Sequence, residues 1–322
     1  MNNARKLVAR FIVVMILAIL FAVGVSTAVV EAPQTVDDVN EERAGRVKRI
    51  IGGEPIVAGQ WPWLVNVRGH VPTKYFWWWA VGYADVYCGG AIINRRWILT
   101  AAHCFFVSGV PEHGIAQPSN WYVKAGDERL TFDFGQRLCA IWNRIRGLHN
   151  LHCWYLPVEK IITHDQFRSH ENWRNDIALV KLTQDLPLAP ADSTIDAVKL
   201  PDLAGWPSAG VDCSVQGWGC TSAGGPLEQS AYSLSLQILD TSQCSEINVP
   251  EQICAGYSGQ NKGLCKGDSG SPLVCRDANG DWVQAGIASF TSATSPGDVP
   301  GVFTRVSHYL EWINSTITAN TL

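Results

Sequence analysis

Gly267-Asp268-Ser269-Gly270-Ser271-Pro272 is the stretch that decides how this chain is interpreted. A serine between glycines is a weak pattern when it is taken alone. Two other short blocks precede it, namely Leu99-Thr100-Ala101-Ala102-His103-Cys104 and Asn175-Asp176-Ile177-Ala178-Leu179. The chain therefore presents a histidine, an aspartate and a serine in that order, and chain order separates unrelated proteins that use the same three residues for catalysis.

Composition and charge are those of a globular protein. Of the 322 residues, 47% are hydrophobic and 17% are charged, which suits a chain with a sizeable core. Residues 1–49 hold 7 of the 25 Lys and Arg and 5 of the 29 Asp and Glu, so residues 50–322 keep 18 and 24, a net charge of −6. This balance argues against a nucleic-acid partner.

The N-terminus has the features of a targeting segment. A basic stretch from Arg5 to Arg10 precedes an apolar run from Phe11 to Val23 and small residues, which predicts a signal peptide over residues 1–28. Residues 11–30 are also just long enough to remain as a membrane anchor. Both alternatives export the rest of the chain, and cleavage predicts a secreted protein.

The cysteines agree with export. All ten lie beyond residue 87, and an even number in an exported chain indicates disulfides, here five. Asn314-Ser315-Thr316 is the single Asn-x-Ser/Thr sequon, which makes Asn314 a candidate glycosylation site.

Short runs rich in Val, Ile, Leu and Trp follow residue 50 and are separated by Gly, Pro, Asn and Asp. They predict an all-β protein of the barrel or sandwich type. Pro187–Gly210 is interpreted as a connector, and Val306–Thr318, with Ser307 as a possible cap, as the one helix. The strand candidates are Trp63–Val67, Ala91–Leu99, Trp121–Ala125, Ile177–Leu182, Ser214–Gly217, Tyr232–Ile238, Pro272–Cys275 and Trp282–Phe290.

From Ile50 to about Ile317 the chain closely resembles the trypsin/chymotrypsin family of serine endopeptidases. The resemblance implies two packed antiparallel six-stranded β-barrels, a C-terminal α-helix and an active site in the cleft between the barrels. A peptidase domain over 50–322 would place the first barrel at roughly 50–187 and the second barrel with the helix at roughly 188–322. The matching motifs are Arg-Ile-Ile-Gly-Gly at 49–53, Cys-Gly-Gly at 88–90, Thr-Ala-Ala-His-Cys at 100–104, Asn-Asp-Ile-Ala-Leu at 175–179, Gly-Trp-Gly at 217–219 and Gly-Asp-Ser-Gly at 267–270.

The resemblance makes His103, Asp176 and Ser269 a catalytic triad. A serine hydroxyl needs an adjacent base to attack a peptide carbonyl. His103 can take the proton of Ser269 and return it to the leaving amine, while Asp176 holds the imidazole in one tautomer. The N–H groups of Gly267 and Ser269 would form the oxyanion hole, where losing one donor costs about 2.7–4 kcal/mol. This chemistry requires no cofactor.

An activation site is also implied. Residues 29–49 are polar, acidic and free of cysteine, as in a loosely held propeptide. The resemblance implies cleavage between Arg49 and Ile50, followed by insertion of the new Ile50 ammonium group beside Asp268. Arg46-x-Lys48-Arg49 suits a furin-like activating protease, and Arg49 alone suits a trypsin-like one.

The cysteine pattern departs from the family at one place. The resemblance implies Cys88–Cys104, Cys213–Cys275 and Cys244–Cys254, whereas the usual partner of Cys265 is absent because no cysteine follows Cys275. The extra Cys220 is predicted to replace that partner, and Cys139 and Cys153 are predicted to close an insertion. His149-x-x-His152-Cys153 has a spacing that zinc can use, but Cys153 has this disulfide role and we predict no metal site.

The specificity pocket also departs from trypsin. Gly263 stands where trypsin-like members carry an aspartate, so a substrate Lys or Arg would be buried without a partner. Counting without gaps makes Thr291 and Gly301 the wall residues, behind Ser289 and with Phe290 on the substrate-binding wall. We expect an apolar residue before the scissile bond, as in chymotrypsin-like and elastase-like members, unless Asp298 folds into the pocket.

The segment Arg68–Tyr87 is longer than usual and contains Tyr75-Phe76-Trp77-Trp78-Trp79. In the family it borders the leaving-group side of the cleft. An exposed aromatic patch would indicate a docking surface. We favour packing of these rings on the barrel, because three adjacent tryptophans cannot all face one way in a strand.

Two functions remain open at this point. The first is a secreted serine endopeptidase, made as a zymogen, with protein or peptide substrates, an activating protease and protein inhibitors as partners. The second is a binding protein that uses the protease fold and its enlarged loops for docking. A membrane is a partner only if the N-terminal segment stays uncleaved, which would give a type II membrane-anchored protease.

Overall fold

A computed structural model of the chain describes residues 50–77, 79–106, 117–130, 155–188, 194–244 and 247–321. The predicted signal peptide, the propeptide, the Cys139–Cys153 pair and the His149–Cys153 stretch lie outside these residues. Within the described part of the chain, no helix is long and apolar enough to cross a membrane.

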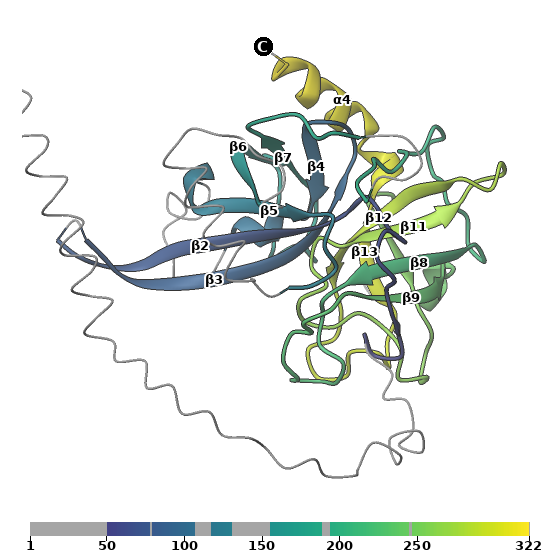
Figure 1. Cartoon of the computed structure of the whole chain (residues 1–322). Coiled ribbons are helices and arrows are strands. Elements are labelled where there is room, and N and C mark those ends of the chain that lie inside the picture. The colour runs from purple at the N-terminus through teal and green to yellow at the C-terminus, as the bar shows by residue number, and fades with distance from the viewer. Residues whose placement is uncertain are drawn as a thin grey trace, which may run out of the picture. The chain divides into compact units, whose positions relative to one another are not determined.

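Six antiparallel strands close the first barrel in the order β2-β3-β4-β7-β6-β5 (Figure 1). Alternation of side chains along each strand places Val65, Val67 and Val123 inside, where they are fully buried. The short strands β4 and β7 are buried along their whole length. The strands are β2 (Leu64–Phe76), β3 (Trp79–Ile92), β4 (Trp97–Thr100), β5 (Trp121–Ala125), β6 (Tyr155–Thr163) and β7 (Ala178–Leu182).

A seven-stranded antiparallel sheet forms the second half, in the order β1-β9-β8-β11-β12-β13-β10. An isolated bridge between Ile238, just after β9, and Ala255 in β10 joins the two sides of this sheet, so β8 to β13 curl into a barrel with β1 added at β9. The strands are β1 (Glu54–Pro55), β8 (Asp212–Gly217), β9 (Tyr232–Gln237), β10 (Gln252–Ala255), β11 (Pro272–Arg276), β12 (Trp282–Phe290) and β13 (Gly301–Arg305). The all-β, two-barrel prediction is confirmed, with β1 as a seventh strand.

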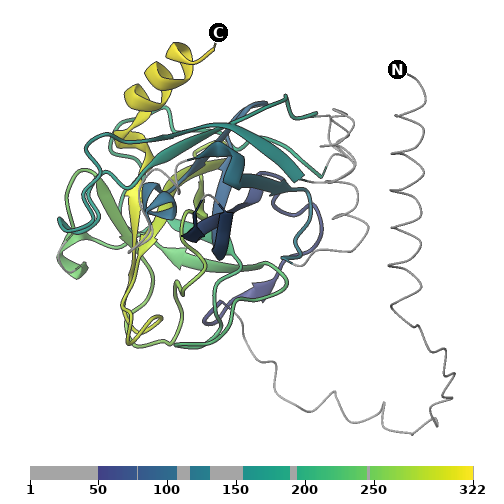
Figure 2. The same cartoon turned by 90° about the vertical axis from the view of Figure 1, so that its left-hand side faces the viewer.

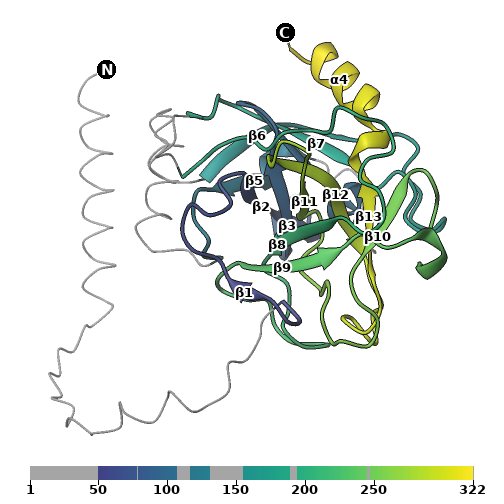
Figure 3. The same cartoon turned by 90° about the vertical axis from the view of Figure 1, so that its right-hand side faces the viewer.

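The C-terminal segment links the two halves. Three-residue 3-10 helix η6 (Val306–His308) follows β13 and leads into α4 (Leu310–Ala319). Val306, Tyr309 and Ile313 are buried in the core cluster that also fills the first barrel. Figures 1 and 3 accordingly show α4 beside β6 and β7, at the edge of the first barrel.

Two local predictions are wrong. Ala91–Leu99 is not one strand, because the side chain of Asn94 accepts the N–H groups of Arg96 (2.9 Å) and Trp97 (3.0 Å) and turns the chain between β3 and β4. Ser307 does not cap the helix, since its hydroxyl donates to the carbonyl of Trp206 at 2.7 Å. The α-helix therefore begins only at Leu310.

The prediction that the Trp-rich segment packs on the barrel is also wrong for Trp77 and Trp79, the two residues of Tyr75–Trp79 whose side chains the structure describes. β2 and β3 continue as a two-stranded hairpin beyond Gly69, the last residue of β2 that pairs with β5. Figure 1 shows this hairpin projecting away from the barrel, and Figure 2 views the molecule from that side. No strand of the described chain covers its outer part, so Trp77 and Trp79 are exposed.

Candidate active site

His103 is positioned by the wall of the first barrel. It lies in the 3-10 helix η2 (Ala102–Phe105), three residues after the buried strand β4 ends. The next residue, Cys104, forms a disulfide with Cys88 of β3. A strand on one side and a covalent bond on the other therefore fix the backbone that carries the imidazole.

Asp176 lies against this histidine, just before β7, and is fully buried. Its Oδ1 accepts the backbone N–H of His103 at 2.8 Å, and its Oδ2 lies 2.7 Å from His103 Nδ1. The hydroxyl of Ser289 also donates to Oδ2. This arrangement directs Nδ1 of the ring to the carboxylate and leaves Nε2 for a reaction partner.

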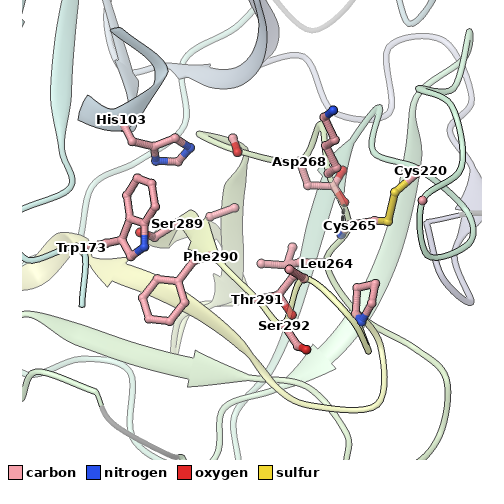
Figure 4. Close-up of a pocket in the computed structure, with 16 residues that line it drawn as sticks. His103, Trp173, Cys220, Leu264, Cys265, Asp268, Ser289, Phe290, Thr291 and Ser292 are labelled. Carbon is pink, nitrogen blue, oxygen red and sulfur yellow. Dashed lines mark hydrogen bonds between the residues drawn. A yellow bond between two sulfur atoms is a disulfide. The ribbon is translucent and has the colours of Figure 1, made fainter. Parts of the chain in front are cut away.

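Ser269 and His103 line the same pocket, which has a volume of about 440 Å³. Figure 4 shows His103, Trp173 and Phe290 on one side of this pocket and the Cys220–Cys265 disulfide on the other. The backbone carbonyl of Ser269 accepts the N–H of Gly89 at 2.7 Å, which ties the serine to β3. Among the described residues, the N–H groups of Gly267 and Ser269 have no acceptor.

The carboxylate of Asp268 is buried beside these groups. It accepts the N–H of Gly219 at 2.8 Å and the N–H of Cys265 at 2.9 Å. A Cβ at position 219 would overlap this carboxylate, so the position requires glycine. Burial raises the pKa of Asp268 to about 7, although the two N–H groups act to lower it.

Ile50 is fully buried in the core of the second barrel. Its φ is 44°, which a β-branched residue rarely adopts because its Cβ clashes with neighbouring backbone. The carbonyl of the next residue, Ile51, accepts the N–H of Gly263 at 3.0 Å, close in sequence to Asp268. Arg49 lies outside the described residues.

Three of the five predicted pocket residues, Ser289, Phe290 and Thr291, line the pocket, and Gly263 and Gly301 do not. A Cβ on Gly263 would meet Gly297 Cα at 3.0 Å, so this residue faces another loop. A Cβ on Gly301 would meet Leu264 Cδ1 at 2.7 Å, which means that the Leu264 side chain covers Gly301.

Leu264, Trp173 and Pro296 are pocket residues that the sequence reasoning missed. Leu264 adjoins Gly263 in sequence, and its burial could not be read from a count along the chain. Trp173 lies three residues before Asp176, and its ring meets that of His103 edge-on with the centroids 5.0 Å apart. Asp298 is exposed and is not part of the lining.

The loop that carries Trp173 is held by the second barrel. Asn172, Trp173 and Asn175 all have φ between 48° and 56°, a left-handed conformation that asparagine tolerates but that a bulky tryptophan rarely adopts. The amide of Gln252, in β10, donates to the carbonyl of Asn172 at 2.7 Å and to that of Trp173 at 3.3 Å.

Further contacts hold the same loop. Glu251 receives two hydrogen bonds from Arg174, at 2.6 and 3.0 Å. Asn248 donates to the carbonyl of Glu171 at 3.0 Å. The hydroxyl of Tyr309 donates to Asn175 Oδ1 at 2.9 Å. Together with the Gln252 bonds, these contacts offset the backbone strain around Trp173.

Four disulfides are present in the described chain: Cys88–Cys104, Cys213–Cys275, Cys220–Cys265 and Cys244–Cys254. These four pairs are the ones that the sequence predicts, including the unusual pair of Cys220 with Cys265. Both sulfurs of that pair belong to residues that line the pocket. The bond links Cys220, which follows Gly219, to Cys265, which precedes Ser269. The backbone N–H groups of Gly219 and Cys265 both donate to the carboxylate of Asp268.

Comparison with known proteins agrees with this geometry. The sequence model of the family described as Trypsin matches residues 50–127 and 150–313. The chain belongs to the trypsin family. The trypsin-family match covers the residues of both barrels and leaves out a part of the insertion around Cys139.

A curated protein with a similar sequence is "Ovochymase" from Halocynthia roretzi. It is 29% identical over 282 residues, which cover 85% of this chain but only 15% of the relative. The chain thus spans about one seventh of the length of that relative. What the two share is a trypsin-family serine protease domain.

Proposed function

We propose that the chain is a serine endopeptidase that cleaves peptide bonds through an acyl-enzyme. The observation that carries the proposal is the His103–Asp176 pair, 2.7 Å apart, in the pocket that Ser269 also lines. Asp176 is buried and held by Ser289, so it can keep the imidazole in the tautomer with Nε2 unprotonated.

The steps follow from these positions. Ser269 Oγ attacks the carbonyl carbon of the scissile bond and passes its proton to His103 Nε2. The negative charge that forms on the carbonyl oxygen is met by the N–H groups of Gly267 and Ser269. The C–N bond then breaks, and the leaving amine takes the proton from His103, which leaves an acyl-enzyme on Ser269. Water next attacks the acyl carbonyl and passes its proton to His103. The ester bond to Ser269 then breaks, Ser269 takes this proton back, and the carboxylic acid is released.

A serine-directed phosphonate tests this proposal. We expect the processed wild-type chain to be labelled at Ser269, whereas the Ser269→Ala variant stays unlabelled and loses about 10⁶-fold in turnover. A correctly processed wild type that takes no label would favour the binding-protein alternative instead.

Activation by cleavage between Arg49 and Ile50 is supported by two observations. Within the described residues the hydrogen-bond donors to the buried Asp268 are two backbone N–H groups and no cation, and a buried carboxylate without a cationic partner is costly. Ile50 is already buried in the same half of the molecule, with a strained φ that depends on the carbonyl of Arg49. Cleavage removes that carbonyl and creates an ammonium group that can pair with Asp268.

An apolar residue before the scissile bond is supported by the floor of the pocket. Leu264 and Pro296 contribute apolar surface to the pocket lining, whereas a buried basic substrate residue would need a carboxylate as its partner. Asp268 is the one carboxylate in the lining, and both of its oxygens accept backbone N–H groups. Because Leu264 covers Gly301, the pocket suits medium aliphatic side chains better than large aromatic ones.

Export is proposed from the sequence of residues 1–28 and from the four disulfides, which persist in oxidising compartments. Asn314, the candidate glycosylation site, is exposed on α4. Peptide mapping of secreted material would test the signal cleavage, the glycan and the Arg49–Ile50 cut together. Protein substrates, an activating protease and inhibitors remain the partners we propose.

A further inference from the structure

We infer that the projecting β2–β3 hairpin is a docking surface for protein substrates, and that it binds an extended apolar segment on the leaving-group side of the scissile bond. This inference rests on the proposed peptidase function and specifies its substrate class. The hairpin face that carries it is defined by Trp79, Val81 and Tyr83 of β3, together with Trp77 at the tip, and is called the aromatic face below.

The aromatic face exposes large apolar side chains. The exposed fractions are 77% for Trp77, 65% for Trp79, 62% for Val81 and 51% for Tyr83. Contiguous exposed apolar surface of this kind is unusual in a soluble protein and marks interaction sites. Trp77 also has a φ of 56°, where the turn favours glycine or asparagine, so local backbone energetics do not account for a tryptophan there.

The aromatic face lies on the same strand, β3, whose other end contacts Ser269 through Gly89. From Tyr83 to Gly89 β3 pairs with β2 without a register shift, so the side-chain positions of these two residues lie on the same face. Beyond the register shifts near Val81, Trp79 and Val81 remain the exposed residues and alternate with partly buried ones, as Tyr83 does. At the Gly89 end that face meets the second barrel, because a Cβ on Gly89 would meet the backbone of Ser271 at 2.8 Å. The N–H of Gly89 donates to the carbonyl of Ser269.

The edge of β3 offers backbone groups along the same route. β3 pairs with β2 throughout, but it pairs with β4 only at Ala91 and Ile92. The N–H of Gly89 binds Ser269 and its carbonyl accepts the hydroxyl of Thr100, so both groups point away from β2. The direction of the backbone N–H and C=O groups alternates from residue to residue along a strand. The N–H and C=O groups of Tyr87, Asp85 and Tyr83 therefore also point away from β2.

Within the described chain no strand pairs with this edge between Trp79 and Gly90. An extended peptide that leaves Ser269 can therefore add to β3 as a further strand, with main-chain bonds to the edge and alternate side chains on the aromatic face. Ten residues separate Gly89 from Trp79, which corresponds to about 33 Å of strand. A substrate must therefore extend about ten residues beyond the scissile bond to reach the tip.

Charge favours a protein over a bilayer as the occupant. Residues 50–322 carry a net charge of −6, which repels anionic lipid surfaces. On the hairpin, Asp85 is paired with His70 at 2.8 Å, and the His70 ring stacks on Tyr83 at 4.3 Å. The carboxylate that borders the aromatic face is thus hydrogen-bonded to a side chain of the hairpin itself.

Substrate length tests the inference. The processed chain is given a small ester of an apolar amino acid and a series of peptides with the same residues before the scissile bond but two, six or twelve apolar-rich residues after it. We expect kcat/KM of the wild type to rise about tenfold between the shortest and the longest peptide. In the double variant Trp79→Ser/Tyr83→Ser this rise should disappear while ester hydrolysis is unchanged.

The control is the double variant Val57→Ser/Leu203→Ser, which removes two exposed apolar side chains elsewhere on the surface, with exposed fractions of 71% and 69%. It should keep the dependence on peptide length. If all variants hydrolyse the ester and length has no effect on the wild type, the docking inference is overturned and the peptidase proposal stands. If the wild type does not hydrolyse the ester, the peptidase proposal itself fails. Binding of the tip to phosphatidylcholine/phosphatidylserine vesicles without a length effect would point to a membrane and overturn the inference.

Discussion

At the scale of single residues, Asp268 gives the most direct prediction. In the uncut chain burial raises its pKa to about 7, whereas an unfolded aspartate titrates near 3.8. Between these values the folded state holds more protons than the unfolded state, so the free energy of unfolding falls as pH rises through this window and levels off above pH 7. The contribution of Asp268 is on the order of 4 kcal/mol at most.

Denaturant unfolding of the uncleavable Arg49→Gln precursor at pH 4, 5.5 and 7 measures this slope. The variant Arg49→Gln/Asp268→Asn lacks the titrating group and should lose less stability across the same pH range. If the Ile50 ammonium group pairs with Asp268 in the processed wild type, as we propose, it favours the ionised carboxylate, and the slope of that protein should also be smaller. Equal slopes in all three proteins would contradict the burial of an unpaired carboxyl in the precursor.

Leu264 gives the second prediction at this scale. Its side chain covers Gly301, so the Leu264→Ala variant should deepen the pocket and admit aromatic substrate residues. We expect the ratio of kcat/KM for phenylalanine over leucine before the scissile bond to rise about tenfold or more. A matched Ser292→Ala change, on the pocket lining, should leave this ratio within about twofold. An unchanged ratio in the Leu264→Ala variant would place the pocket floor elsewhere.

Gly263 and Leu264 also show how far the residues could be predicted. A count back from Ser269 predicts that Gly263 replaces the aspartate of trypsin-like members at the base of the pocket, but Gly263 does not line the pocket. The identity of the side chain that fills the space could not follow from the count, since it depends on how Leu264, Gly301 and Pro296 pack in three dimensions.

At the scale of elements, the loop from Glu171 to Asn175 is positioned by β10. Gln252 is almost fully buried and donates to two carbonyls of the strained segment that presents Trp173 to His103. Replacing it by Leu removes both bonds and leaves two carbonyls without these donors. We expect KM for peptide substrates to rise about five- to twentyfold, while kcat falls by less than threefold.

A double-mutant cycle checks this role. Trp173→Ala should raise KM by a similar factor, and Gln252→Leu in the Trp173→Ala background should have little further effect on KM, because both act through the same ring. A purely structural role for Gln252 predicts additive effects instead. Gln237→Leu is a useful control, since this amide of neighbouring strand β9 donates to Gly210 and Asp212, away from the pocket.

Elements differ in how well their sequence predicts them. The buried runs of β7 and β12 are predictable because apolar residues predominate in them, with Lys181 the exception in β7 and Gln284 and Ser289 the polar exceptions in β12. The break between β3 and β4 was missed because it depends on a side-chain hydrogen bond of Asn94. The sequence predicts packing of the hairpin because three adjacent tryptophans cannot all face one way in a strand, and its exposure follows only from the absence of a covering strand in the described chain.

At the scale of the whole molecule, the two-barrel architecture was predictable because several short motifs resemble one family in a fixed order. The pairing of Cys220 with Cys265 followed in the same way, from one missing and one extra cysteine. The contribution of the C-terminus to the first barrel was not expected, since α4 follows the second barrel in sequence and its apolar positions do not reveal their partners.

The packing of the C-terminal helix α4 against the first barrel leads to the last prediction. Ile313 of α4 is fully buried in the core cluster of the first barrel, together with Val306 and Tyr309. Ile313→Ala should lower the free energy of unfolding by about 2–5 kcal/mol, or the Tm by roughly 5–15 °C. Because α4 is continuous with β13 through η6, both halves should melt together in calorimetry, and the exposed Asn314→Ala should change the Tm by about 1 °C or less. Two separate transitions, with only the first shifted by Ile313→Ala, would show that the barrels unfold independently and that α4 stabilises one of them alone.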